Sequence, residues 1–413
     1  MPIDVRTRVD GDAAPTDPSW FFEAGLPAAL ECTRQLRARS LGRLRLKPLA
    51  LCCGGLAWTL EQENDVRIRA GVSPGALRWE LDPDALDALV SDQTTPIGLY
   101  ASGALGLATS ELPSLLDWWL VLRSALDKHS IYTPGAVTFV DRDGKPLDLH
   151  RTFLPSDDLT EMRHFLGEAG FLHIAGLFTA DEMAQISVEM DRNQPSYSDG
   201  DKQSWWVTTA DRQRRLVRMQ HFDTRSPPTA ALLADERLAW LATLSGDGHQ
   251  QAAESSNRIE ALIKPLGVVE GISDVPWHKD CSLGRCSYEC SSLTVGISVT
   301  GADQASGQLR VVAGSHRALL WPARLVPGHH DLPEIDLPTD AGDITLHASC
   351  TLHMAEPPLE RERRVLYTSL RLPDRAPEAA AAARHRLRAV RERAPLTVSQ
   401  PPSRVTLPRT RRA

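Results

Sequence analysis

The chain has 413 residues, of which 42% are hydrophobic and 24% charged, and its formal net charge is -7. This composition is typical of a folded protein of two or three domains, and the slightly acidic charge gives no reason to expect a nucleic-acid partner. No apolar run suits a secretory signal or a membrane span. We therefore expect a cytoplasmic protein without stable membrane insertion.

The seven cysteines are an odd number and stand at positions 32, 52, 53, 281, 286, 290 and 350. Without a secretory context we interpret them as reduced thiols. Cys281, Cys286 and Cys290 lie close together and could suggest structural zinc, but their spacing is not Cys-x-x-Cys and no fourth ligand is near. Thiols in a loop beside a functional site are the alternative that we favour.

The first 135 residues predict a small α+β domain. Residues 1–18 are polar with three prolines, so we expect a flexible N-terminus, and the domain itself spans residues 19–135. An apolar pattern from residue 20 predicts a helix interrupted near Pro27, and Asp82 followed by Pro83 predicts the start of another. An amphipathic pattern after Ser110 predicts a closing helix. Short apolar runs predict strands at residues 48–62, 66–70, 77–81 and 97–107.

This order of elements resembles the sterol carrier protein type 2 family, in which a small sheet and helices enclose a lipid tunnel. The similar stretches are Leu81–Leu86, Tyr100–Leu107 and the Trp-rich final helix. The resemblance implies lipid binding, and the alternative is an unrelated α+β domain that packs on the rest of the chain. Trp118 and Trp119 could line a cavity, but core packing is the more frequent use of such residues.

The turn-rich residues 136–152 predict a linker or edge hairpin before a second domain at residues 153–375. That domain begins with a predicted helix from Ser156 that ends at Gly170, a strand from Phe171, and a second capped helix from Thr179.

Residues 195–211 are polar and contain Trp205 and Trp206, which predicts an exposed loop. It could form a lid over substrate or lie buried against the neighbouring domain. Strands follow at residues 292–300 and 308–312. Residues 376–413 predict a short helix and then a basic, Pro-rich disordered tail.

A candidate metal site begins at His278 and Asp280, which project from one face of an extended chain because they are two positions apart. A third ligand could be His347 or His353, which both follow a Gly-Asp turn. Two imidazoles and one carboxylate leave coordination positions open, a set that suits non-haem Fe(II). Alone, a His-x-Asp pair is more often a surface hydrogen-bonding pair.

Four blocks in order resemble the phytanoyl-CoA dioxygenase family of Fe(II)- and 2-oxoglutarate-dependent oxygenases: Trp277–Asp280, Ser306–Arg317, Gly342–His353 and Arg364. The resemblance covers about residues 153–372. It implies an α+β protein whose C-terminal part is a double-stranded β-helix, or jelly roll, with flanking helices. Two departures are Ala313, where the family usually has Pro, and Ala355, where members often have Ser near the co-substrate carboxylate.

The resemblance implies that His278, Asp280 and His353 are the metal ligands and catalytic residues. It also implies that Arg364, 11 residues after His353, binds the far carboxylate of 2-oxoglutarate, and that Lys264 is a second co-substrate residue. No basic residue stands at that distance from His347. Arg363 points to the opposite face of the same strand and is the second candidate. We expect His316 to stabilise a turn.

The expected activity is a dioxygenase reaction with Fe(II), and with 2-oxoglutarate and O2 as co-substrates, that releases succinate and CO2. The expected substrate is a small or lipid-like molecule. Because Asp280 stands where related halogenating enzymes have a small residue, hydroxylation or desaturation is expected. The alternative is a catalytically silent lipid carrier that retains a metal site.

Overall fold

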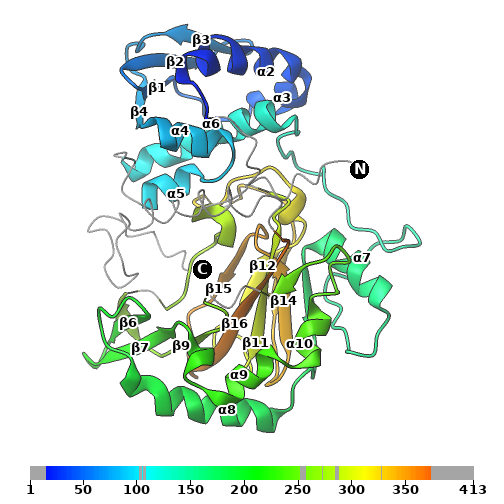
Figure 1. The fold of residues 1–413 in the computed structure, drawn as a ribbon. Coiled ribbons are helices and arrows are strands. Elements are labelled where there is room, and N and C mark those ends of the chain that lie inside the picture. The colour runs from blue at the N-terminus through cyan, green and yellow to red at the C-terminus, as the bar shows by residue number, and fades with distance from the viewer. Residues whose placement is uncertain are drawn as a thin grey trace.

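The computed structural model describes residues 15–101, 105, 108–251, 257–271, 273–283, 288–326 and 328–373. Cys286 and the predicted tail at 376–413 lie outside these residues. Helices and a four-stranded sheet form the N-terminal part, and a nine-stranded and a three-stranded sheet with flanking helices form the rest (Figure 1). No helix among the described residues is long and apolar enough to cross a membrane.

The N-terminal sheet has the strand order β3-β2-β1-β4, with β1 and β4 parallel and the other pairs antiparallel. Its strands are β1 (Leu49–Cys53), β2 (Leu56–Gln62), β3 (Val66–Ala70) and β4 (Leu77–Leu81). The predicted strand at 48–62 is two strands, because Gly54 and Gly55 adopt positive φ in a tight turn between them.

Helices surround this sheet and end in a long buried one. They are α1 (Pro18–Trp20), η2 (Phe21–Gly25), α2 (Leu26–Cys32), α3 (Arg34–Leu41), α4 (Pro83–Val90), α5 (Pro96–Ala101), η3 (Thr109–Glu111) and α6 (Leu112–Asp127). The strand predicted at 97–107 is wrong for its first part, which forms α5. The hydroxyl of Thr95 accepts a hydrogen bond from the Gly98 N–H, and Pro96 follows it, so the local sequence favours the start of a helix.

Helix α6 is buried on nearly every side and joins the two parts of the molecule. Trp118 and Trp119 are fully buried on it, and the Trp118 indole donates to the Lys47 carbonyl, so both are core residues. Its Asp117 accepts a hydrogen bond of 3.0 Å from the indole of Trp321, which belongs to the second part of the chain. Tyr288 and Trp321 belong to the hydrophobic core around α6, so a few residues of the second part complete the core of the first, while the second part also has a separate core of its own.

The second part begins with capped helices around β5 (Phe171–Ile174). Helix α7 (Leu159–Ala169) starts at Asp158, whose carboxylate accepts from a backbone N–H, and ends at Gly170 with φ of 84°. Helix α8 (Ala180–Asn193) opens with a capping box. The remaining helical segments are η4 (Gln194–Ser196), η5 (Phe222–Thr224), α9 (Pro227–Leu233), α10 (Glu236–Leu241), η6 (Asp280–Leu283) and η7 (Ser315–Arg317).

A large and a small sheet form the double-stranded β-helix. The large sheet has the order β10-β6-β7-β9-β16-β11-β14-β5, with β8 paired to β16, and the small sheet has the order β13-β12-β15. Their other strands are β6 (Ser204–Thr209), β7 (Arg214–Met219), β8 (Gln250–Gln251), β9 (Glu260–Lys264), β10 (Val268–Glu270), β11 (Ser292–Ser298), β12 (Leu309–Val312), β13 (Glu334–Leu337), β14 (Ile344–Ala348), β15 (His353–Ala355) and β16 (Arg363–Arg371).

Alternation along β11 separates the two faces of the large sheet. Leu293, Val295 and Ile297 belong to the large hydrophobic core together with residues of α7 to α10, whereas Thr294 and Ser298 carry polar groups on the other face. Trp205 and Trp206, predicted in an exposed loop, lie instead on β6 and pair with β7. Both are partly buried.

Candidate metal centre

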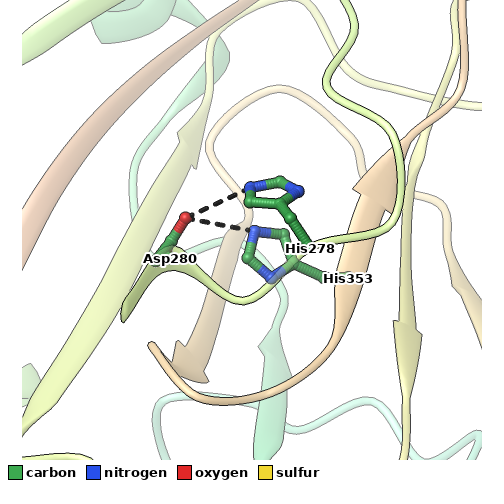
Figure 2. A group of neighbouring side chains, drawn as sticks. All are labelled: His278, Asp280 and His353. Atoms are coloured by element: carbon green, nitrogen blue, oxygen red, sulfur yellow. Dashed lines mark ion pairs between the residues drawn. The ribbon is translucent and has the colours of Figure 1, made fainter. Parts of the chain in front are cut away.

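Three side chains from separate segments point toward one another between the sheets (Figure 2). His278 lies in an isolated bridge, Asp280 opens η6 and His353 begins β15. The backbone N–H of His278 donates to the His353 carbonyl, and the reverse bond is also formed, each at 2.9 Å. This reciprocal pair fixes the two imidazoles side by side, although 75 residues separate them in the sequence.

The Nε2 atoms of His278 and His353 each lie 3.4 Å from Asp280 Oδ1. This distance exceeds that of a good hydrogen bond, and it is compatible with donor atoms that share one ion. Of the described residues, this is the sole group of three whose ligand atoms lie close enough to bind a metal, all within 4.8 Å. The His278 and Asp280 side chains keep 24% and 33% exposure, so the group is accessible from one side.

Backbone carbonyls orient both rings. Nδ1 of His278 lies 2.7 Å from the Pro276 carbonyl oxygen, and Nδ1 of His353 lies 2.9 Å from that of Thr351. In neutral imidazoles this places the proton on Nδ1 and leaves the Nε2 lone pair free for a metal, the usual arrangement of metal-binding histidines.

The charge state of the group also suits metal binding. Burial, followed by the neighbouring His353, lowers the pKa of His278 below its ordinary value. Burial raises the pKa of Asp280, but the surrounding histidines outweigh it and leave this pKa well below its ordinary value. At neutral pH the metal-free group therefore holds a neutral imidazole and an ionised carboxylate, the forms that bind metals.

The second oxygen of Asp280 meets a different set of groups. Thr294 donates a hydrogen bond of 2.7 Å to Oδ2, and the hydroxyl of Ser349 lies 3.1 Å from that of Thr294. His347 Nε2 lies 3.6 Å from the same Oδ2. His347 and His353 are the two candidates for the third ligand. The structure brings His353 into the group and places His347 beside Asp280. Sequence reasoning missed Thr294 on β11 and Ser349 in the turn after β14, because isolated hydroxyl residues carry no distinctive motif.

The structure does not bring Arg364 to this centre. Its guanidinium donates to the Ser187 carbonyl and hydroxyl on α8 and pairs with Asp191 at 2.8 Å and Glu362 at 2.9 Å. Arg363 projects from the opposite face of β16 and is 3% exposed. The expectation that Arg364 lies at this centre is therefore corrected. Successive strand residues face opposite ways, so a spacing from His353 that is wrong by one residue selects an arginine on the wrong face of the sheet.

Arg363 and Lys264 are opposite each other in the register of β16 and β9. The Lys264 Nζ and Arg363 Nε atoms are buried and have no hydrogen-bond partner, although Arg363 also donates to the Gly307 carbonyl. Burial, and then the charge of Arg363, lowers the pKa of Lys264 well below its ordinary value. Two buried basic groups with unused donors indicate a site for an anion, because an unpaired buried charge is costly.

A small, partly open pocket adjoins Arg363 between the two sheets. Gly296 lines this pocket. A side chain at this position would not fit, because a Cβ atom would lie 2.7 Å from Thr345 Oγ1 and 3.0 Å from Tyr367 Cε1. The remaining lining residues come from both sheets and the turns between them: Ser298, Ala302, Leu309, Leu337, Thr339 and Val365. A small anionic ligand with an apolar stem would match such a lining.

A second polar cluster lies on β6, β7 and β9. Arg218 forms an ion pair with Glu260, and its guanidinium carbon lies 4.1 Å from the centroid of the Trp205 ring. Burial lowers the pKa of Arg218, whereas Glu260 and then Asp280 raise it, which places this arginine within electrostatic reach of the metal group. All three side chains are partly exposed. Sequence reasoning did not single out Arg218 or Glu260.

The remaining candidates lie around the centre without joining it. Cys281 and Cys290 are buried and form no disulfide with a described cysteine, and the Cys290 N–H points at the sulfur of Cys350 at 3.1 Å. The described cysteines form no metal-binding group of three. Nε2 of His316 lies 3.0 Å from the Gly167 carbonyl, and burial lowers the pKa of His316 to about 4, as suits a residue that stabilises a turn.

Residues 166–364 match the family model described as phytanoyl-CoA dioxygenase (PhyH), a range that contains Lys264, His278, Asp280, His353 and Arg363. A search of curated proteins gives no match. The resemblance of the N-terminal part to sterol carrier proteins stays a prediction.

Several solved structures resemble the second part of the chain. AviO1 from Streptomyces viridochromogenes Tue57 is 21% identical with a TM-score of 0.43, over 52% of this chain and 96% of that one. EctD from S. alaskensis, with 2-oxoglutarate and 5-hydroxyectoine, is 17% identical with a TM-score of 0.40, over 58% and 85%. HygX from Streptomyces hygroscopicus, with nickel and 2-oxoglutarate, is 17% identical with a TM-score of 0.36, over 51% and 86%.

Proposed function

Residues 166–364 form a domain of the phytanoyl-CoA dioxygenase family, and from this premise we propose that the protein is an Fe(II)- and 2-oxoglutarate-dependent oxygenase of a small molecule. The observation that carries the proposal is the convergence of His278, Asp280 and His353, with both Nε2 atoms 3.4 Å from one carboxylate oxygen. Two imidazoles and one carboxylate would hold Fe(II) and leave positions open. When bound, iron and 2-oxoglutarate together supply the oxygen activation that oxidises a substrate C–H bond.

Arg363 and Lys264 would bind the far carboxylate of 2-oxoglutarate, in place of the pair Arg364 and Lys264 expected from the sequence. Their unused buried donors support this role, as does the pocket that adjoins Arg363. The planar guanidinium of Arg363 can donate two parallel hydrogen bonds to a carboxylate. Tyr367 Oη lies 3.5 Å from an Arg363 nitrogen and would help to orient that group.

The cluster of Trp205, Arg218 and Glu260 would face the substrate. It offers an aromatic surface beside a charged pair, within electrostatic reach of Asp280. These groups fit a substrate that combines an apolar body with a polar substituent, which includes the lipid-like substrates expected from the sequence. Hydroxylation is the proposed outcome because Asp280 retains its carboxylate.

A silent lipid carrier has less support. Trp118 and Trp119, the residues that could line a lipid tunnel, are packed in the core of the N-terminal part. The buried basic pair Arg363 and Lys264 would have no use in a protein that binds only an apolar ligand.

Succinate formation tests the proposal. The protein with Fe(II), 2-oxoglutarate and air should release succinate slowly even without its substrate, and Asp280→Ala and His353→Ala should each reduce the rate to that of a protein-free control. Arg364→Gln is the matched control, because Arg364 lies on the outer face of the sheet. Equal succinate from native protein and Asp280→Ala would reject the proposal.

A further inference from the structure

We propose that His347 is a positioning residue of the metal centre: together with Thr294 it fixes Asp280 so that only Oδ1 faces the metal. This inference rests on the proposed function, because it requires a metal bound by His278, Asp280 and His353. It adds a role for a residue that belongs to neither the metal ligands nor the co-substrate pair.

The environment of His347 indicates that its ring nitrogens have a polar partner in the functional state. The side chain is 1% exposed, and neither ring nitrogen has a hydrogen-bond partner. A buried imidazole without partners destabilises a fold relative to an apolar residue of similar size. Because the unpaired imidazole destabilises the fold, it is expected to gain a hydrogen-bond partner when the site is functional.

The His347 ring lies beside the carboxylate of Asp280, with Nε2 at 3.6 Å from Oδ2. Oδ2 already accepts one hydrogen bond, from Thr294 at 2.7 Å, and a carboxylate oxygen can accept a second. Oδ1 faces the two metal-binding imidazoles instead. The two oxygens of Asp280 therefore have separate roles, and a small shift would bring His347 within hydrogen-bond distance of the second.

The backbone explains why Thr294 and His347 can act as a pair. They are direct partners in the register of β11 and β14, so both side chains project from the same face of the large sheet. Asp280, by contrast, opens the short segment η6. Two donors on paired central strands can thus orient a carboxylate carried by a less regular segment.

A direct metal bond from His347 is not what the geometry favours. His347 is absent from the group of three whose ligand atoms lie within 4.8 Å of one another. The His353 ring lies 4.3 Å from the rings of both His278 and His347, measured between centroids. His347 thus lies beside both Asp280 and His353 but outside the group of three.

Cobalt(II) binding to the full chain tests the inference, since it needs neither turnover nor a known substrate. His347→Leu should weaken Co(II) binding by about 10- to 100-fold and change the visible Co(II) spectrum, whereas His347→Gln, which keeps an N–H donor, should remain within about threefold of the native protein. Thr294→Val removes the other donor with little change of shape and should weaken binding in the same direction. His164→Gln, on the surface, is the control for loss of an imidazole.

Three outcomes would overturn the inference: native Co(II) affinity in both His347→Leu and Thr294→Val, an unchanged spectrum in both, or an equal loss in His347→Gln and His347→Leu. The last would make His347 a fourth ligand. Failure of the proposed function would look different, because then Asp280→Ala would bind Co(II) as tightly as the native protein.

Discussion

Arg363 and Arg364 are neighbours in the sequence but meet opposite environments. Arg363 is buried beside Lys264 with an unused donor, and Arg364 is bound by Asp191, Glu362 and the carbonyl of Ser187. Each guanidinium is thus assigned a separate partner: an anionic ligand for Arg363 and helix α8 for Arg364.

Replacement of the two arginines should therefore have opposite consequences. Arg363→Gln should weaken 2-oxoglutarate binding by about 1.5–3 kcal/mol, or about 10- to 150-fold, because it removes charge-assisted hydrogen bonds to a carboxylate. Arg364→Gln should change that affinity less than threefold and lower the melting temperature instead. Isothermal titration of the Co(II)-loaded protein with 2-oxoglutarate distinguishes them, and the reverse order of effects would restore Arg364 as the carboxylate ligand.

For single residues, the sequence predicts the relations between side chains that are close together in the chain. His278 and Asp280 lie two residues apart, so their shared direction follows from the motif itself. The choice between Arg363 and Arg364 depends on how the turn between β15 and β16 sets the phase of the next strand. A turn can lengthen or shorten by one residue without any change in composition. The spacing from His353 alone could therefore not distinguish Arg363 from Arg364.

Among the elements, helix α8 depends on a charged cap. Glu182 completes the capping box with Thr179 and pairs with Arg237 of α10. The hydrogen bond from Arg237 is the main reason that the pKa of Glu182 falls to about 2 from its ordinary 4.5. The ionised carboxylate therefore connects two helices that cover the large sheet.

This shift predicts a pH-dependent effect of Glu182→Gln. Because the folded-state pKa lies below the unfolded one, the carboxylate stabilises the fold above about pH 4.5 and loses that effect as pH falls toward 2. The substitution should reduce the free energy of unfolding by about 1 kcal/mol at pH 7, since the pair is partly exposed, and by less at pH 3. Urea unfolding at both pH values measures this, and a constant difference would contradict it.

Element types follow from the sequence wherever caps are explicit, as at Asp82 and Thr179. They do not follow for short apolar runs, which fit a strand or a buried helix equally well. Residues 97–101 form α5 for this reason. The segment with Trp205 and Trp206 is a strand because its partner β7 supplies hydrogen bonds, which its polar composition does not reveal.

The whole molecule is organised by contacts between its two parts. Trp321 lies in the core around α6 and donates to Asp117, while Tyr288 donates to Asp127 at 3.0 Å. Helix α5 also contacts η6, the segment that begins with Asp280. The N-terminal part therefore supports the segment that carries Asp280, the proposed metal ligand. These pairings join residues more than 160 positions apart, so no sequence pattern predicts them.

The packing of Tyr288 and Trp321 in the core around α6 predicts that the two parts unfold together. Trp321→Ala should lower the free energy of unfolding by about 3–5 kcal/mol, because it opens a cavity and removes the hydrogen-bond donor to Oδ1 of buried Asp117. Trp20→Ala, at a site 62% exposed, should change it by less than about 0.5 kcal/mol. Circular dichroism and tryptophan fluorescence should report one transition; two transitions, with Trp321→Ala affecting one of them, would show independent domains.

The most direct test of the account is an anaerobic titration of the protein with Fe(II) and 2-oxoglutarate, followed by visible absorption. The native protein should develop the weak charge-transfer band of a 2-oxoglutarate complex of Fe(II), and Asp280→Ala should not. A band of equal strength in Asp280→Ala, or no band in the native protein at saturating Fe(II) and 2-oxoglutarate, would contradict a metal centre built from His278, Asp280 and His353.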